Sequence, residues 1–340
     1  MNRQQSTVQS TRRAGGRRGP TTAAILAMIV VAAACGSADP GAEVVDSAES
    51  SEDVASTTET TTAIEETTTS VAEPPITAPI TESIEIPEPA PIDEDPGWEL
   101  VWSDEFDGDT IDTTAWTYDI GGWGWGNGEA QYYTDRPENA RLENGLLVIE
   151  ARQEQFEDSY YTSARLKTEG LKEFQYGRIE ARIKVPAGAG LWPAFWMLGS
   201  GFEHGSDDPA RSWPNVGEID VMEYLGREPD LIMGTIHGPG YAGGGGLTRW
   251  NRQDYPIADE FHTYSVEWSP EGISWFYDGE LYYTVTPEDL SGREWVFDKE
   301  FFLILNLAVG GQFPGPIDLN LEFPVFLFVD HVRVYQQAEG

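Results

Sequence analysis

Three carboxylates lie close together in residues 217–224, a segment that otherwise has the composition of a buried β-strand. Side chains two positions apart on a strand share a face, so Glu218 and Asp220 point the same way. Glu223 joins them only if Val221–Met222 adds one extra residue as a β-bulge. Acidic groups held so close repel one another, and one of them must take up a proton. One ionised and one protonated carboxyl are the pair that glycoside hydrolysis needs.

Two other interpretations of this segment are a solvent-facing acidic strand and an acidic metal-binding loop. The apolar residues Ile219, Val221 and Met222 argue against a solvated loop, and the spacing of the acids matches no calcium-loop template. Carboxylates with perturbed pKa values are also concentrated at functional sites. The sequence therefore favours catalysis over both alternatives.

The rest of residues 97–340 predicts the strands that would hold these acids. Apolar and polar residues alternate with period two, as in 178–185, and helical periodicity is scarce. Asp278-Gly279 between two such runs is a hairpin signal. Further strands are expected at 99–103, 145–152, 163–168, 192–199, 233–237, 263–268, 273–277, 280–285, 301–308 and 327–336. Many short strands in one domain predict an all-β, jelly-roll β-sandwich with a concave substrate-binding sheet.

The acidic segment also carries a family likeness. Glu-Ile-Asp-Val-Met-Glu at 218–223 resembles the ExDxxE signature of glycoside hydrolase family 16. Further matching segments, spread over 98–337, are 124–133, 162–168, 190–199, 235–241, 306–311 and 329–336. Together they resemble the laminarinase-like branch, which contains bacterial endo-β-1,3-glucanases with a jelly-roll fold. The Val221–Met222 pair gives the bulged form of the motif, whereas lichenases and xyloglucan-modifying relatives usually carry the shorter ExDxE.

The resemblance implies a role for each acid. Glu218 would be the nucleophile, Glu223 the general acid/base, and Asp220 the residue that orients and tunes the nucleophile. Repulsion among the acids agrees with this, because it keeps a proton on one carboxyl that can protonate the leaving oxygen. Once the sugar esterifies Glu218, Glu223 becomes more acidic and can serve as base for water. The expected outcome is retention of the anomeric configuration.

Candidate substrate-binding residues lie in the other matching segments. They are Asn127, Glu129, Arg165, Trp192, Trp196 and His237. Trp192 and Trp196 are four apart on an expected strand and share a face, so they could stack on successive sugar rings or fill the sandwich core. His237 precedes Gly-Pro-Gly, a rigid turn, and is expected at the cleft edge near Glu223.

No cofactor is expected for catalysis, but the resemblance implies one structural Ca²⁺. Its ligands would be Glu105, the backbone of Gly145, and Asp330. His331 stands beside them where relatives commonly have Tyr. Isolated acids are usually surface residues, so the metal rests on the resemblance alone.

The N-terminal region predicts export. Residues 1–34 have a basic start and a short apolar run that ends in Ala32-Ala33-Ala34, which resembles a bacterial lipoprotein signal peptide. Cys35, the single cysteine, would be lipidated. Residues 35–96 are acidic, contain many Thr, Ser and Pro, and predict a disordered stalk. We therefore expect a lipoprotein at the extracellular face of the cell membrane, with a freely secreted protein as the alternative.

Charge and aromatic content restrict the class of substrate that the protein can bind. The formal net charge is −37, so nucleic acid is excluded as a partner by repulsion. All twelve tryptophans follow residue 97, and their rings suit the apolar faces of neutral sugars. The expected function is a monomeric endo-glycosidase that acts on β-1,3-glucan. The alternatives are a β-1,3-1,4-glucanase, another polysaccharide hydrolase of the family, and a non-catalytic surface glucan-binding lipoprotein.

Overall fold

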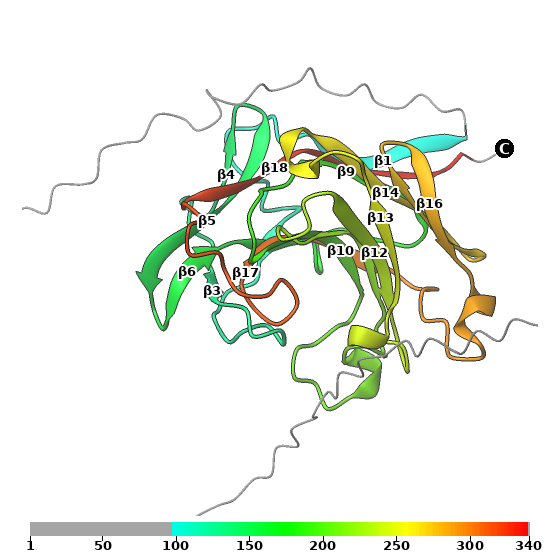
Figure 1. The fold of residues 1–340 in the computed structure, drawn as a ribbon. Helices are drawn as coiled ribbons and strands as arrows, with labels where there is room; N and C mark the ends of the chain where they lie inside the picture. Colours follow the sequence, from blue (N-terminus) through cyan, green and yellow to red (C-terminus); the bar gives the residue numbers. More distant parts are fainter. Residues whose placement is uncertain (1–96, 339–340) are drawn as a thin grey trace, which may run out of the picture. The chain divides into compact units, whose positions relative to one another are not determined.

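The computed structural model describes residues 97–338, which fold into two β-sheets (Figure 1). The ten-stranded sheet has the order β16 (Glu280–Val285), β15 (Gly272–Tyr277), β14 (His262–Ser269), β9 (Gly177–Lys184), β18 (Val325–Gln337), β5 (Leu146–Phe156), β6 (Ser159–Ser163) and β3 (Gln131–Tyr133). On this sheet β1 (Trp98–Asp104) also pairs with β18, and β4 (Ala140–Glu143) with β5.

The eight-stranded sheet carries the three acids. Its order is β13 (Leu247–Arg252), β12 (Leu231–His237), β11 (Glu218–Tyr224), β10 (Leu191–Gly199), β17 (Phe301–Val309), β7 (Arg165–Lys167) and β2 (Thr117–Tyr118), and β8 (Glu173–Phe174) also pairs with β17. The acid-bearing strand β11 therefore has a hydrogen-bonded neighbour on both sides.

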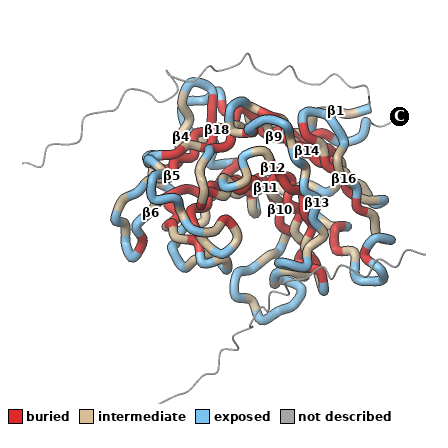
Figure 2. The backbone as a smooth tube through the Cα atoms, viewed as in Figure 1, coloured by how far each residue is buried: buried red, intermediate tan, exposed pale blue. Residues whose placement is uncertain are grey.

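The core lies between the two sheets and explains the alternating pattern of the sequence. Along β9, Ile179, Ala181 and Ile183 are fully buried, and the charged residues between them are partly exposed. In β11, Ile219 and Val221 belong to the same apolar cluster. Figure 2 shows the buried backbone concentrated in the strands of both sheets. Burial of the apolar face of each strand fixes which side chains remain on its other face.

The all-β jelly-roll prediction is confirmed, with one wrong strand and several missed ones. The expected strand at 163–168 is two strands, because the chain leaves β6 at Ser163 and enters β7, on the other sheet, at Arg165. Strand β13 escaped notice because most of its side chains are exposed and it lacks an apolar face. The other missed strands, β2, β3, β4 and β8, have two to four residues each. The concavity of the acid-bearing sheet stays a prediction.

The expected signal peptide at 1–34, the stalk at 35–96 and Cys35 lie outside the described residues. Within residues 97–338, no helix has the length and apolar character needed to cross a membrane.

Candidate active site

The predicted bulge is present in β11. Against β10, Asp220 pairs with Trp196 and Met222 pairs with Phe195, so Val221 is the extra residue. Against β12, the register shifts between Asp220 and Glu223. The shift restores Glu223 to the face of Asp220, because the hydroxyl of Thr235, which pairs with Asp220, donates to Glu223 Oε2 at 3.3 Å. The three acids therefore share one face.

A tryptophan from the opposite sheet supports the bulge. Trp275 donates its indole N–H to the backbone oxygen of Asp220 at 2.8 Å. Gly234 lies opposite the bulge on β12, and a Cβ at this position would come within 2.4 Å of Trp275 Cδ1. A side chain there would exclude the indole. Gly234 therefore allows the close approach that gives a bulged carbonyl its hydrogen bond.

Each glutamate accepts an indole hydrogen bond. Trp213 Nε1 donates to Glu218 Oε2 at 3.0 Å, and Trp192 Nε1 donates to Glu223 Oε1 at 3.1 Å. Asp220 is 4% exposed, and its Oδ2 lies 3.3 Å from His237 Nε2. Among residues 97–338, none of these carboxylates forms an ion pair with Lys or Arg. The cluster is consequently a dense negative site with only neutral donors and one histidine around it.

Burial and repulsion bring protons to this cluster. Burial and the nearby Asp220 carboxylate raise the pKa of Glu218 to about 8 and that of Glu223 also to about 8. Burial raises the pKa of Asp220 well above its usual range. Because the groups are close, they titrate as a unit and share protons. At neutral pH the site can thus hold an ionised and a protonated carboxyl side by side, which is what acid/base chemistry requires.

His237 lies beside different acids from those expected. Its position opposite Glu218 in the β11–β12 register places Nε2 at 3.5 Å from Glu218 Oε1 and at 3.3 Å from Asp220 Oδ2. The expected neighbour, Glu223, bonds instead to Trp192 and Thr235. The register causes the difference, because His237 pairs with Glu218, whereas Glu223 pairs with Met233, four residues away along β12.

Trp192 and Trp196 lie outside the main core. Trp192 reaches Glu223, and Trp196 donates to Asn306 Oδ1 at 2.7 Å. The guanidinium of Arg165 lies over the Trp196 ring at 4.6 Å and is paired with Asp119 through Nε at 2.8 Å. Both rings are half-buried, and Trp196 also packs against a smaller apolar cluster that includes Leu198 and Ile304. Their contact with a sugar stays a prediction.

Asn127 and Glu129 join the same region through hydrogen bonds. Glu129 accepts from Asn127 Nδ2 at 3.1 Å and from the Tyr133 hydroxyl at 3.2 Å. Tyr133 in turn accepts from Asn306 Nδ2 at 3.2 Å, which links Glu129 to the partner of Trp196. Burial raises the pKa of Glu129 despite these donors. Both predicted residues therefore support the Trp196 side of the site and do not contact the three acids.

Sequence reasoning missed Trp213, Asn306 and Tyr133. Trp213 is 43% exposed and lies in the connection between β10 and β11, which contains the 3₁₀ turn Pro209–Arg211. A tryptophan five residues before Glu218, in a segment rich in Gly, Ser and Pro, is poorly placed for a core and could have been recognised from that. Asn306 and Tyr133 carried no comparable signal, because only the sheet pairing brings them to the site.

The predicted calcium ligands meet at a gap in the ten-stranded sheet. Strand β5 pairs with β18 up to Val329, and β1 pairs with it from Val332, so Asp330 lies between the two pairings. Glu105 directly follows β1, and Gly145 directly precedes β5. The register therefore brings the three predicted positions together.

Two arginines already neutralise the acids at this gap. Arg333 donates to both oxygens of Glu105, at 2.9 and 2.7 Å, and Arg182 donates to Asp330 Oδ2 at 2.9 Å. Burial acts to raise the pKa of Glu105 and of Asp330, but hydrogen bonds outweigh it, from Arg333 to Glu105 and from His331 and Arg182 to Asp330, and lower both. Carboxylate and carbonyl oxygens are the ligand types that Ca²⁺ prefers. An ion here would have to share both carboxylates with guanidinium groups.

A cavity of about 690 Å³ lies away from the three acids and is not part of the candidate active site. Its lining includes Trp98, Tyr176, Ser274 and Thr284, which lie on or next to strands of the ten-stranded sheet. The acids lie on the eight-stranded sheet. We therefore define the candidate active site by the carboxylates and their donors.

Two family models match this chain, and several known proteins resemble it. The model of glycosyl hydrolases family 16 matches residues 126–312, and the model of beta-glucan synthesis-associated protein SKN1/KRE6/Sbg1 matches residues 2–214. A beta-glucanase of Rhodothermus marinus is 48% identical over 256 residues, which cover 73% of this chain and 88% of that protein. The laminarinase catalytic domain of Thermotoga maritima is 46% identical, with a TM-score of 0.67 over 72% of this chain and 100% of the other. The endo-beta-1,3-glucanase of Pyrococcus furiosus is 47% identical, with a TM-score of 0.68 over 73% and 98%.

Proposed function

Because the chain belongs to glycosyl hydrolases family 16, we propose that it hydrolyses internal β-1,3 bonds of a neutral glucan with retention of configuration. The bulged strand β11 carries the proposal, since it places Glu218, Asp220 and Glu223 on one face. The relatives described as a beta-glucanase and as laminarinases support this substrate class. The enzyme is a glycoside hydrolase, and its chemistry needs no cofactor.

In the first step, a Glu218 oxygen attacks the anomeric carbon while the glycosidic C–O bond breaks. Glu223 gives its proton to the leaving oxygen, so the departing chain ends in a hydroxyl and the sugar is esterified to Glu218. Hydrogen bonds from Trp213 to Glu218 and from Trp192 to Glu223 hold the two groups in place. Asp220 is buried and lies between Glu218 and Glu223 in the sequence. Together with His237, it sets the electrostatic environment of the Glu218 carboxylate.

In the second step, Glu223 is ionised and takes a proton from water. The water oxygen bonds to the anomeric carbon, and the ester bond to Glu218 breaks. In the intermediate, the esterified Glu218 carries no charge and no longer repels the Glu223 carboxylate. The pKa of Glu223 therefore falls, and Glu223 can act as the base. Two inversions at the same carbon give net retention.

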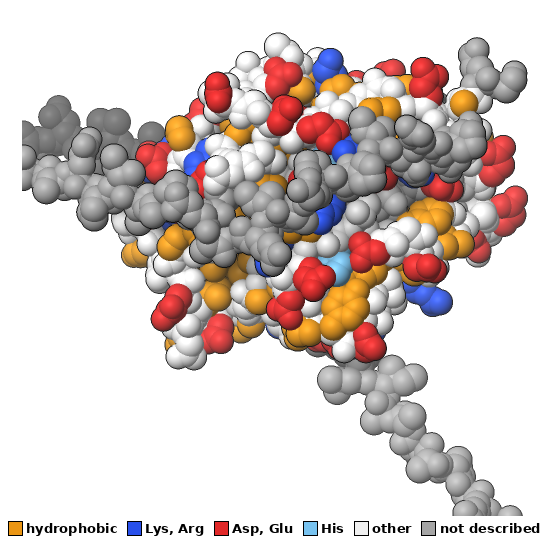
Figure 3. All heavy atoms as spheres, turned by 90° about the horizontal axis from the view of Figure 1, so that it is seen from above, with side chains coloured by type: hydrophobic (Ala, Val, Ile, Leu, Met, Phe, Trp, Pro, Cys, Tyr) orange, Lys and Arg blue, Asp and Glu red, His pale blue; other side chains and the backbone are white. Residues whose placement is uncertain are grey.

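A neutral polysaccharide also suits the surface. Figure 3 shows acidic side chains spread over one face of the molecule, with Lys and Arg side chains scattered among them. The chain contains 58 acidic and 21 basic residues, so a polyanion would be repelled. The indole rings of Trp192, Trp196 and Trp213 beside the acids offer flat apolar surfaces for uncharged sugar faces.

Comparison of products decides between this activity and its alternatives. We would incubate the protein with laminarin, lichenan and agarose and follow the anomeric signals of the first products by NMR. The expected result is β-anomer release from laminarin through oligosaccharides of several lengths. Faster cleavage of lichenan would support a β-1,3-1,4-glucanase, and faster cleavage of agarose another family activity. Binding of laminarin without hydrolysis would support a non-catalytic surface glucan-binding lipoprotein.

The match to the synthesis-associated model supports no separate activity. It ends at residue 214, before Glu218, Asp220 and Glu223. A role in glucan synthesis would therefore need a reaction that uses the same carboxylates, such as transfer of the glycosyl group to a sugar hydroxyl in place of water.

We also propose export and a lipid anchor on Cys35, at the extracellular face of the cell membrane, supported by the sequence alone. Cys35→Ala should move the protein from the membrane fraction to the soluble fraction. An unchanged membrane fraction would contradict the anchor and leave secretion or another attachment. We propose that the protein is a monomer, which light scattering after size-exclusion chromatography would test.

Calcium binding at Glu105, Gly145 and Asp330 is likewise a proposal. The strand register supports it, and the pairing of both acids with arginines predicts that the ion adds little stability. None of the proposed catalytic steps uses a residue of this site.

A further inference from the structure

We propose that Glu218, Asp220 and His237 form a binding site for a divalent transition-metal ion such as Zn²⁺, and that the bound ion inhibits the enzyme. Metal binding follows from the geometry of the three side chains. The inhibition rests on the proposed function, because it requires Glu218 to be the nucleophile.

Two of the three ligand separations match those of a tetrahedral zinc site. His237 Nε2 lies 3.3 Å from Asp220 Oδ2 and 3.5 Å from Glu218 Oε1. With zinc bonds of about 2.0–2.2 Å to nitrogen and oxygen, two ligands of a tetrahedron are about 3.3–3.5 Å apart. One ligand atom from each residue lies within 4.8 Å of the others, so rotation of a carboxylate can close the remaining edge.

Asp220 supplies a buried oxygen that has no donor. The side chain is 4% exposed, and Oδ2 has no hydrogen-bond partner among the described residues, although it faces His237 Nε2. A buried acceptor without a donor is costly, and a cation at this point would satisfy it. Within the described residues, no Lys or Arg is paired with the acids of the cluster, so positive charge is missing where the negative charge is most concentrated.

The backbone holds the ligands in place. Glu218 and His237 are directly opposite each other on adjacent strands, and Asp220 follows two residues later on the same face. Gly246 lies behind the imidazole, because a Cβ there would come within 2.5 Å of His237 Nδ1. Ligands on paired strands need little reorganisation to bind an ion. His237 Nδ1 has no hydrogen-bond partner among the described residues, so we expect weaker binding than at structural zinc sites, where this nitrogen is held by a second group.

The ligand types select the metal. An imidazole nitrogen with two carboxylates favours Zn²⁺, Cu²⁺ or Co²⁺ over Ca²⁺ and Mg²⁺, which take oxygen ligands. The side chains of Glu218 and His237 are 15% and 13% exposed, so the fourth coordination position can be reached from outside. A bound ion would hold the Glu218 lone pair needed for attack and would occupy space beside the scissile bond. The inhibition should therefore be competitive with substrate.

Binding of Co²⁺ tests whether the three side chains hold a metal ion. We would titrate the full-length protein with Co²⁺ and record visible absorption, and measure Zn²⁺ stoichiometry by calorimetry. One ion should bind, with the d–d absorption of a four- or five-coordinate site. His237→Gln should abolish the band, and His204→Gln, at an exposed histidine of the β10–β11 connection, should leave it unchanged. Circular dichroism would confirm that both variants are folded.

Kinetics on the native protein test the inhibition. Zn²⁺ should raise the KM for laminarin at least about tenfold at a concentration ten times its dissociation constant, as competition at one site requires. EDTA should reverse this, and Ca²⁺ should not reproduce it. Absence of the cobalt band, or a band that survives His237→Gln, would overturn the metal site. A band without Zn²⁺ inhibition of an active enzyme would overturn the inhibition, and a band on a protein inactive toward laminarin would count against the proposed function alone.

Discussion

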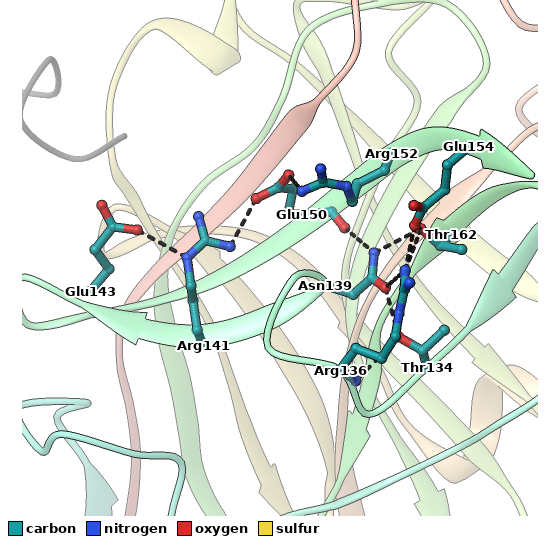
Figure 4. Close-up of polar contacts among 9 residues, drawn as sticks. All are labelled: Thr134, Arg136, Asn139, Arg141, Glu143, Glu150, Arg152, Glu154 and Thr162. Carbon is teal, nitrogen blue, oxygen red and sulfur yellow. Dashed lines mark hydrogen bonds and ion pairs between the residues drawn. The ribbon is translucent and has the colours of Figure 1, made fainter. Parts of the chain in front are cut away.

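Two groups of buried or partly buried carboxylates in this molecule have opposite surroundings. On β4, β5 and β6, Glu150 lies between Arg141 and Arg152, and Glu154 is paired with Arg136 (Figure 4). Asn139, Thr134 and Thr162 complete that network with neutral hydrogen bonds (Figure 4). On β11, by contrast, the acids have indole, hydroxyl and imidazole partners and no guanidinium.

The contrast separates support of the fold from chemistry. For Glu154, burial acts to raise the pKa, but hydrogen bonds from Thr162 and Arg136 outweigh it and lower the pKa. For Glu218 and Glu223, burial and Asp220 raise the pKa to about 8, and the opposing effects of His237 on both and of Arg165 on Glu218 are too small to offset them. A carboxylate that is held ionised stabilises a fold, and one that readily gains and loses a proton serves catalysis. The surroundings of an acid, together with its burial, distinguish the two uses.

The largest expected effect comes from glutamine substitution in each group. Glu218→Gln and Glu223→Gln should each lower kcat on laminarin by at least about 10²-fold and up to about 10⁴-fold, because the nucleophile or the acid is lost. Glu150→Gln is the matched control, at a buried acid of the arginine network. It should lower the free energy of unfolding and leave activity per folded molecule unchanged. Kinetics and urea unfolding on the three variants would measure this.

Azide rescue then assigns the roles. With an activated aryl glycoside, Glu218→Ala should regain activity with azide and give the inverted glycosyl azide, because azide attacks the substrate directly. In Glu223→Ala azide should attack the glycosyl ester on Glu218 and give the glycosyl azide with retained configuration. The opposite pattern would mean that the two roles are exchanged. Comparable activity losses in Glu150→Gln and Glu218→Gln would remove the contrast between the two groups.

A smaller effect is expected from the indole that supports the nucleophile. Trp213→Phe removes the 3.0 Å hydrogen bond to Glu218 and keeps an aromatic ring. A hydrogen bond to a charged group contributes about 1.5–3 kcal/mol, so kcat/KM should fall about 10- to 100-fold. Stability should change little, because the side chain is half-exposed. Tyr160→Phe, at an exposed aromatic side chain on β6 of the other sheet, is the control and should retain full activity. An unchanged pH profile with unchanged kcat/KM in Trp213→Phe would show that the indole does not position Glu218.

The sequence could predict those parts of this contrast that depend on residues close together in the chain. The roles of Glu218, Asp220 and Glu223 depend on spacing within one strand, and the predicted bulge at Val221–Met222 is present. The strand pattern likewise depends on local alternation, which failed only at Ala164, where the chain changes sheets, and in short or exposed strands such as β13.

Contacts between distant segments were out of reach. The partner of Trp196 is Asn306, which is 110 residues away, and the N–H that meets the bulge comes from Trp275, 55 residues from Asp220. His237 was expected beside Glu223, and the register moved it to Glu218 and Asp220. Sequence periodicity gives the face of a strand, but the partner across the sheet depends on the register of the complete fold.

The pH dependence of stability should distinguish the two groups by sign. Glu218 and Glu223 have a pKa of about 8 against an ordinary 4.5, so the folded protein binds their protons more tightly than the unfolded chain. Their contribution is fully present below pH 4.5 and is lost as pH rises toward 8. Glu154, whose pKa is lowered, contributes above its unfolded value, and this contribution is lost as the pH falls.

Urea unfolding across this range measures both contributions. A double variant with Glu218→Gln and Glu223→Gln should lose less stability than the native protein between about pH 5 and about pH 8. Glu154→Gln should instead flatten the acidic side of the profile. Activity of the native enzyme should decline on the alkaline side as Glu223 loses its proton. Parallel stability profiles for the native protein and the double variant would contradict the raised pKa values.

The smallest effect is expected at the proposed calcium ligands, whose acids resemble the arginine network more than the active site. Glu105 and Asp330 are paired with Arg333 and Arg182, so Ca²⁺ would find their charges already neutralised. A stabilisation below about 1 kcal/mol corresponds to a rise in Tm of at most about 2–4 °C for a domain of this size. Excess Ca²⁺ and EDTA should therefore give melting curves that differ by no more than this. Arg182→Gln frees one oxygen of Asp330 from its guanidinium, and its Tm should respond more strongly to Ca²⁺ than that of the native protein. A large calcium response in the native protein would mean that the ion displaces the arginines from Glu105 and Asp330.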